Sequence, residues 1–269
     1  SRSGPMNHHI QTLTPPMSMS PTLRLLVVLL LFTSCAAIQD EKEARRLNEE
    51  GLALFHAGQF EQALVLMRQA ASKRAIQNVT RGYIYRNISI VYNNWEQPDS
   101  AKHYAGVAAG YFPEESYEYL INTADVYLYD NDIPQALELL KRALALRTDD
   151  MSVYKSLGLI YLGEHGDEYQ DLDQALEFNS KAYELSKDPN STFILALTHF
   201  EREEFEQAEQ YLRAVVEQYG GNADQYCMLG MAQYRLDKKA HAEIAWARTV
   251  AMDTSYTESI ETYKIMYGE

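Results

Sequence analysis

Residues 154–182 read YKSLGLIYLGEHGDEYQDLDQALEFNSKA, and this stretch decides the fold. Its first eight residues place apolar side chains at the three- and four-residue steps of an α-helix. A polar turn follows from Gly163 to Asp173, and a second apolar period then begins, in which Ala175 and Ala182 lie seven residues apart. The stretch therefore predicts two helices joined by a turn, with small residues where the helices touch.

The spaced alanine pair recurs along the chain. Six copies keep the seven-residue spacing, the last two in a looser form: Ala63/Ala70, Ala101/Ala108, Ala136/Ala143, Ala175/Ala182, Ala208/Val215 and Ala242/Thr249. Their first members follow one another after 38, 35, 39, 33 and 34 residues. A period near 34 residues indicates a stacked helix–turn–helix array, in which each unit buries its apolar face against the next.

The first helices of three units share an order of residues. Residues Tyr154, Leu157, Gly158 and Tyr161 give the order aromatic, leucine, glycine, tyrosine, and parts of it recur as Leu47, Gly51 and Leu54 and as Tyr226, Leu229 and Gly230. This order resembles that of the tetratricopeptide repeat family. The resemblance covers about residues 44–256. It implies an all-α fold, a right-handed superhelical solenoid of about six helix–turn–helix repeats with a C-terminal capping helix.

We expect the following organisation. A disordered extension and a signal peptide occupy residues 1–34, and a short tether occupies 35–43. The six repeats fall at 44–77, 82–115, 117–150, 151–188, 189–222 and 223–256. Residues 257–269 form the capping helix that terminal repeats need.

Small residues are predicted to occupy the contact between the two helices of each repeat. In the first helices these are Gly51, Ser89, Ala124, Gly158, Ala196 and Gly230. They face the first alanine of each pair. Two helices approach closely only where the side chains between them are small, and a glycine inside a helix, which costs about 1 kcal/mol, needs such a reason.

Composition excludes several functions. The formal net charge is −14, and the chain has no basic stripe of the kind that nucleic-acid binding requires. The two cysteines, Cys35 and Cys227, lie far apart and form neither a disulfide framework nor a zinc motif.

The N-terminal segment combines a basic residue, an apolar run and a cysteine. Arg24 precedes an apolar run over residues 25–32, which is too short to span a bilayer. The run ends in Leu31-Phe32-Thr33-Ser34-Cys35-Ala36, which is similar to the lipobox in the leader of a bacterial lipoprotein. This resemblance implies cleavage before Cys35, lipid on its sulfur, and sorting to the outer membrane of a cell envelope. An ordinary secretory signal with a chance cysteine stays open as the alternative.

No catalytic set stands out in the sequence. The histidines are scattered, and we interpret His199 as a core imidazole in place of an aromatic residue. The long turn over 163–173 is acidic but lacks the spacing of a calcium loop. We therefore predict no enzyme activity, no cofactor and no metal.

The candidate binding residues come from the family's pattern. In that family, fixed positions of each first helix face the concave groove. Here they give the predicted partner-binding set Tyr83, Asn87, Ile90, Asn94, Asn122, Tyr129, Phe193, Leu197, Phe200, Met228, Met231 and Tyr234. Asparagines in such places can donate to and accept from a peptide backbone. The terminal-carboxylate clamp known in this family looks incomplete, because Arg86 and Lys155 stand isolated in the sequence.

The sequence therefore predicts a non-enzymatic adaptor that is lipid-anchored in the bacterial envelope and binds a protein or peptide in its groove. It predicts no nucleic-acid partner and no small-molecule substrate. Two alternatives remain open at this stage: a lipoprotein accessory to glycan or nutrient uptake, and, more remotely, a metal-dependent enzyme that uses the acidic turn.

Overall fold

The computed structural model describes residues 21–268, and it describes side chains from Ala36 onward. The predicted N-terminal extension lies largely outside the described residues. The described chain is helical throughout and holds no strand, so the predicted all-α class is confirmed. Between residues 21 and 268, no helix combines the length and the apolar character needed to cross a membrane.

The described chain divides into two compact units, residues 21–80 and 81–268. The first unit contains α1 (Pro21–His56) and α2 (Phe60–Ala71). Residues 35–43, which we predict as a tether, are helical within α1. A tight turn at Gly58, whose φ of 74° suits glycine, joins the two helices. The boundary between the units falls after Thr80, in the first turn of α3.

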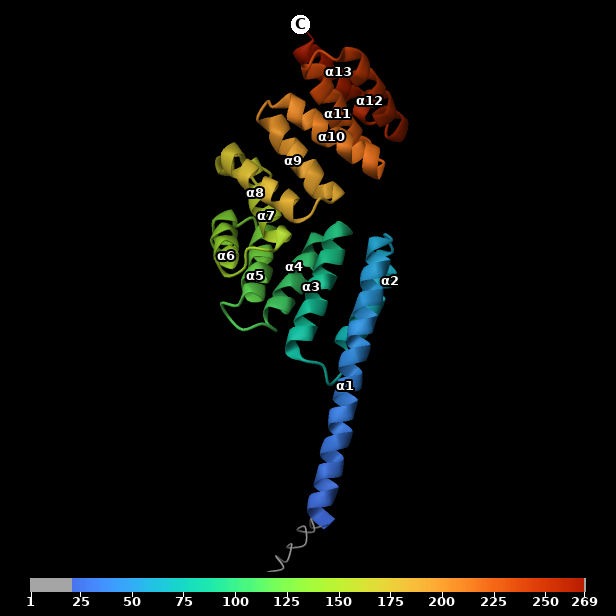
Figure 1. The fold of residues 1–269 in the computed structure, drawn as a ribbon, viewed down its shortest axis with the longest axis vertical. Coiled ribbons are helices and arrows are strands. Elements are labelled where there is room, and N and C mark those ends of the chain that lie inside the picture. Colours follow the sequence, from blue (N-terminus) through green and yellow to red (C-terminus); the bar gives the residue numbers. More distant parts are fainter. Residues whose placement is uncertain (1–20, 269) are drawn as a thin grey trace, which may run out of the picture. The chain divides into compact units, whose positions relative to one another are not determined.

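The second unit continues as pairs of helices, coloured from green to red in Figure 1. The helices are α3 (Asn78–Asn94), α4 (Pro98–Ala109), α5 (Tyr117–Tyr129), α6 (Ile133–Leu146), α7 (Met151–Leu162), α8 (Leu172–Leu185), α9 (Pro189–Glu201), α10 (Phe205–Tyr219), α11 (Ala223–Arg235), α12 (Lys239–Met252) and α13 (Tyr256–Tyr267). From α5 to α13, each helix packs on the helix that precedes it. Below, the first helix of a pair is called the A helix and the second the B helix.

Polar caps explain where many of these helices begin. Asp150 accepts hydrogen bonds from Ser152 at the start of α7, and Asp188 accepts them from Asn190 and Ser191 at the start of α9. Such side chains satisfy backbone N–H groups that have no partner inside the helix. Asn222 forms a reciprocal capping box with Gln225 on α11. Pro98 begins α4, where no amide donor is needed.

The predicted small-residue contacts are confirmed. The first alanine of every pair is 0% exposed: Ala63, Ala101, Ala136, Ala175, Ala208 and Ala242. Opposite them, the Ser89 hydroxyl donates to the Ala101 carbonyl at 2.7 Å. A methyl group added to Gly158 would lie 1.9 Å from Asn179 Oδ1, and one added to Gly230 would lie 2.3 Å from Trp246 Nε1. The glycines are thus required by packing.

The last helix, α13, covers the end of the final repeat. Ile260 is 3% exposed and joins Cys227, Ala242 and Trp246 in one apolar cluster. Tyr263 packs edge-on against Tyr234 and Trp246. The helix therefore buries apolar surface that the last repeat would otherwise expose, as the predicted cap requires.

Exchanging Gly158 for Ala tests the close contact. The added methyl overlaps Asn179, and overpacking costs about 1–3 kcal/mol, against about 1 kcal/mol gained in helix propensity. We expect Gly158→Ala to lower the free energy of unfolding by up to about 2 kcal/mol, measured by denaturant titration.

The matched control is Gly106→Ala in α4. Its new methyl would meet only Val126, at an ordinary 3.8 Å. We expect this variant to gain about 0.4–1 kcal/mol. If both substitutions shift stability in the same direction, the contact at Gly158 is not the constraint that we describe.

Candidate functional site

A cavity of about 240 Å³ lies among the A helices of three successive repeats. Helix α3 contributes Arg86, Ser89, Ile90, Asn93 and Asn94; α5 contributes Ile121, Asp125 and Tyr129; α6 contributes Leu140; and α7 contributes Ser152, Val153, Lys155 and Ser156. Side chains three or four residues apart share one face of a helix, which is why each A helix presents a stripe to the cavity. The lining combines charged, amide, hydroxyl and aliphatic groups.

A long ion pair between Arg86 and Asp125 lies in this cavity. Arg86 Nη1 lies 4.0 Å from Asp125 Oδ2, and the two side chains are 18% and 35% exposed. The Nη1 atom is shielded from solvent and has no hydrogen-bond partner. Burial raises the pKa of Asp125 to about 6, although the nearby Arg86 charge opposes the shift. A buried donor without an acceptor is costly, so this pair is poised to accept a further polar group.

Hydrogen bonds between successive A helices frame the cavity. The Tyr129 hydroxyl donates to Asn93 Oδ1 at 2.8 Å, and Lys155 Nζ donates to Asn190 Oδ1 at 3.3 Å. These partners lie 36 and 35 residues apart, about one repeat. Burial raises the pKa of Tyr129, and the Asp125 charge adds to the shift. The tyrosine hydroxyl therefore stays protonated and acts as a donor.

Three predicted groove residues line this cavity: Ile90, Asn94 and Tyr129. The Asn94 amide donates to the Ile90 carbonyl at 2.9 Å and lies at the surface. Asn122 needs a correction, because its side chain is 0% exposed and donates to the Glu118 carbonyl of its own helix. A fully buried amide does not line an open groove.

The other predicted residues lie outside the cavity. Tyr83 is 43% exposed, and its hydroxyl donates to Glu118 at 2.8 Å. Asn87 is half-buried in α3. Six side chains are half-buried and pack against the apolar clusters of the later repeats: Phe193, Leu197, Phe200, Met228, Met231 and Tyr234. The structure thus gives these six a packing role, and their part in binding stays a prediction.

Arg86 and Lys155, isolated in the sequence, are neighbours in the structure. They lie far apart in the sequence, but repeats two and four bring both to the same cavity. Asp125, Asn93, Ser152 and Ser156 also line it and are absent from the predicted set. The usable signal was the four-residue spacing of Ile121, Asp125 and Tyr129 along α5, which places them on one stripe.

The acidic turn is built from local contacts. Asp171 caps α8 by accepting from the Asp173 and Gln174 amides, and Asp173 pairs with Arg202 at 2.6 Å. Among the residues that the structure describes, no group of three or more histidine, cysteine or acidic side chains is placed to hold a metal ion. His199 stacks on Tyr211, as expected for a packed imidazole.

Stacked helix pairs define a helical-repeat solenoid. The cavity, with its mixed polar and apolar lining, lies on the A-helix side of it. The sequence matches the family described as Tetratricopeptide repeat at residues 121–191 and 194–257, just over half of the chain. The chain therefore belongs to the tetratricopeptide repeat family. No curated protein sequence matches it.

Several solved structures share the fold. PilF of Pseudomonas aeruginosa aligns with a TM-score of 0.59 and 18% identity, covering 83% of this chain and 98% of PilF. TTC0263, a thermophilic TPR protein of Thermus thermophilus, aligns with a TM-score of 0.55 and 18% identity, covering 71% of this chain and 99% of TTC0263. YrrB, described as a TPR protein with an unusual peptide-binding site, aligns with a TM-score of 0.51 and 16% identity. The alignment covers 68% of this chain and 92% of YrrB. At these identities the likeness concerns the fold alone.

Titration of Asp125 tests the electrostatics of the cavity. We expect its carboxyl carbon to titrate near pH 6 by NMR, because burial favours the neutral acid. Asp150 is the internal control. Burial would raise its pKa, but hydrogen bonds from Ser152 outweigh that effect, so Asp150 titrates below its ordinary value of 3.8.

The stability consequence follows from the same shift. In the folded chain Asp125 keeps its proton at pH values above its ordinary pKa of 3.8 and up to about 6. Its contribution to the free energy of unfolding therefore falls as the pH rises through that window. Asp125→Asn should remove this step from the pH profile of thermal unfolding. A wild-type midpoint near 4 for Asp125 would contradict our description of the site.

Proposed function

We propose that this protein is a non-enzymatic adaptor that holds a protein or peptide partner against the A-helix face of repeats two to four. The observation that carries the proposal is the cavity around Arg86 and Asp125. An acceptor from a partner would complete the hydrogen bonding of Arg86, while Asn94 at the rim can bind an extended backbone.

The family supports this proposal. Tetratricopeptide repeat proteins are generally interaction scaffolds without enzymatic activity, and the structurally similar YrrB is described as having a peptide-binding site. In repeat arrays, neighbouring units build an extended surface for partners. The cavity is small, about 240 Å³, so it suits one or two side chains of a larger partner.

We further propose that the mature protein is anchored in the bacterial envelope through lipid on Cys35, on the outer membrane. The support is the lipobox-like sequence that ends at Cys35. Two or three acyl chains anchor a protein stably, because each buried methylene contributes about 0.8 kcal/mol. Cys35 lies in α1, but its side chain is outside the described part.

The groove proposal predicts a charge-specific loss of binding. Partners captured from envelope extract by immobilised residues 36–269 would be identified and their affinity measured by titration. We expect Arg86→Gln with Lys155→Gln to weaken binding by at least tenfold, since one hydrogen bond to a charged group contributes about 1.5–3 kcal/mol.

Arg142→Gln with Lys181→Gln is the matched control, because it makes the same charge change on the B helices α6 and α8. This pair should leave the affinity unchanged. Equal loss in both double variants would mean that net charge, and not the cavity, governs binding. No loss in either would reject the proposed site.

The anchoring proposal is tested with the two cysteines. Cells fed an alkyne-bearing fatty acid should label the wild-type protein and Cys227→Ser equally, and leave Cys35→Ser unlabelled. Cys227 is buried at 4% exposure, and burial raises the pKa of its thiol to about 11, so it is a poor acceptor. Label that persists on Cys35→Ser would exclude the proposed lipidation site.

A further inference from the structure

The end of the first unit that adjoins Cys35 is a clasp between α1 and the segment after α2. Asp40 Oδ2 accepts from the Ala75 N–H at 3.1 Å, and Glu41 Oε2 accepts from the Gln77 N–H at 3.0 Å. The Thr80 hydroxyl also donates to Glu41. These bonds hold residues 73–80 beside residues 36–46 of α1. The clasp is defined here as residues 36–46 and 73–80.

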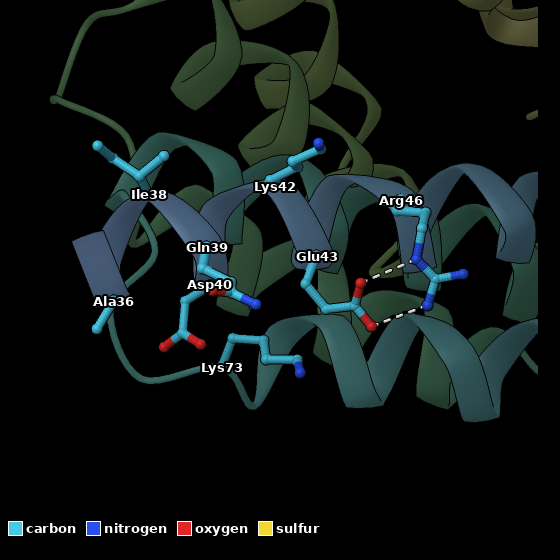
Figure 2. A pocket seen from close by; sticks show the side chains of 8 residues that line it. All are labelled: Ala36, Ile38, Gln39, Asp40, Lys42, Glu43, Arg46 and Lys73. Carbon is cyan, nitrogen blue, oxygen red and sulfur yellow. Dashed lines mark hydrogen bonds and ion pairs between the residues drawn. The ribbon is translucent and has the colours of Figure 1, made fainter. Parts of the chain in front are cut away.

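An open hollow of about 930 Å³ lies on this clasp, lined by Ala36, Ile38, Gln39, Asp40, Lys42, Glu43, Arg46 and Lys73. Figure 2 shows Ile38 and Lys42 on one side of α1, whereas Asp40 and Glu43 lie on the other side with Lys73. Lys42 and Lys73 therefore lie on different sides of α1.

The acidic groups of the clasp are engaged by internal donors. Glu43 pairs with Arg46 at 2.8 Å, as the dashed lines in Figure 2 show. Burial would raise the pKa of Glu41, but hydrogen bonds from Thr80 and Gln77 outweigh it and lower the pKa. Asp40 is bonded to the backbone at Ala75. Lys42 and Arg74, by contrast, are exposed at the surface.

The sign of the charge sets this clasp apart. Residues 36–46 together with Lys73 and Arg74 hold five basic and three acidic side chains. Residues 81–269 hold 16 basic and 32 acidic side chains. Arg46 also pairs with Glu50, which lies just outside this set, so five basic side chains stand against four acidic ones. The small positive charge that remains attracts an anionic surface.

Apolar side chains accompany the basic ones. Ile38 is 70% exposed, and Val79, in the first turn of α3, is 41% exposed. Basic residues interspersed with exposed aliphatic ones suit the interface between lipid head groups and acyl chains. Ile38 lies only three residues from Cys35.

We propose that the clasp is a docking surface for the anionic phospholipid head groups of a bilayer. Lys42, Lys73 and Arg74 bind the phosphates, and Ile38 enters the interface. The proposal rests on the anchoring proposed above for its orientation, since lipid on Cys35 would bring this end to the membrane. The head-group contacts themselves are made by side chains that need no lipid.

Vesicle flotation of residues 36–269 tests the surface without any acyl chain, because this length lacks Cys35 but keeps every described side-chain contact. We expect binding to vesicles that contain phosphatidylcholine and phosphatidylglycerol in a molar ratio of roughly seven to three. Little binding is expected to vesicles of phosphatidylcholine alone. Binding should fall when salt is raised to roughly 0.5 M, which screens exposed charges.

Lys42→Gln with Arg74→Gln should lower partitioning into anionic vesicles by about 30-fold, because each basic residue at the surface contributes about fivefold. Lys187→Gln with Arg213→Gln makes the same charge change on exposed residues of the second unit and should leave binding unchanged. Thermal unfolding of each variant verifies that the fold is retained.

Equal binding to both vesicle types, or equal loss in the two double variants, would overturn the proposed surface. Absence of binding to anionic vesicles would overturn it as well. None of these results bears on lipidation, which the labelling of Cys35 decides separately. Conversely, an unlabelled wild-type protein would remove the lipid anchor and leave the vesicle result standing.

Discussion

The close approach of the A and B helices within each repeat is the constraint on which the structure depends. Six alanines at this contact are 0% exposed, and Gly158 and Gly230 stand where a methyl would overlap a neighbouring side chain. Close packing at these points fixes how each helix is rotated about its axis. That rotation decides which side chains enter the core and which reach the A-helix face.

The repeat period then creates the site. Because equivalent residues of successive A helices face one another, side chains about one period apart meet. Tyr83 donates a hydrogen bond to Glu118, and Lys155 donates one to Asn190; the partners in each pair are 35 residues apart. Tyr129 donates to Asn93, which lies 36 residues earlier in the sequence. Part of the polar surface is thereby used to join repeats. Arg86 and Asp125 lie 39 residues apart and meet only at 4.0 Å, which leaves their interaction incomplete.

This geometry explains what the sequence could and could not predict. Periodicity and alanine spacing were sufficient for the helix pairs, their small-residue contacts and the cap, since these depend on local pattern. Fixed family positions placed Asn122 in the groove, and its helical angle agrees, since seven residues bring Asn122 to within about 20° of Tyr129. Asn122 is nevertheless 0% exposed, because the side chains packed around it cover it, and the sequence pattern does not contain that packing. The meeting of Arg86 with Lys155 depends on packing across three repeats, which no local pattern contains.

The uneven charge of the chain links the two proposals. In the proposed docking, Lys42, Lys73 and Arg74 of the clasp attract an anionic bilayer, whereas residues 81–269, which carry twice as many acidic as basic side chains, are repelled by it. We therefore expect adsorption through the clasp and not through residues 81–269. Within those repeats the Arg86 and Lys155 cavity is a local exception, where two cations share a pocket with one carboxylate whose pKa lies near 6. Its small positive charge belongs to a unit that is acidic overall, so we expect a partner to be selected by shape and hydrogen bonding and not by net charge alone.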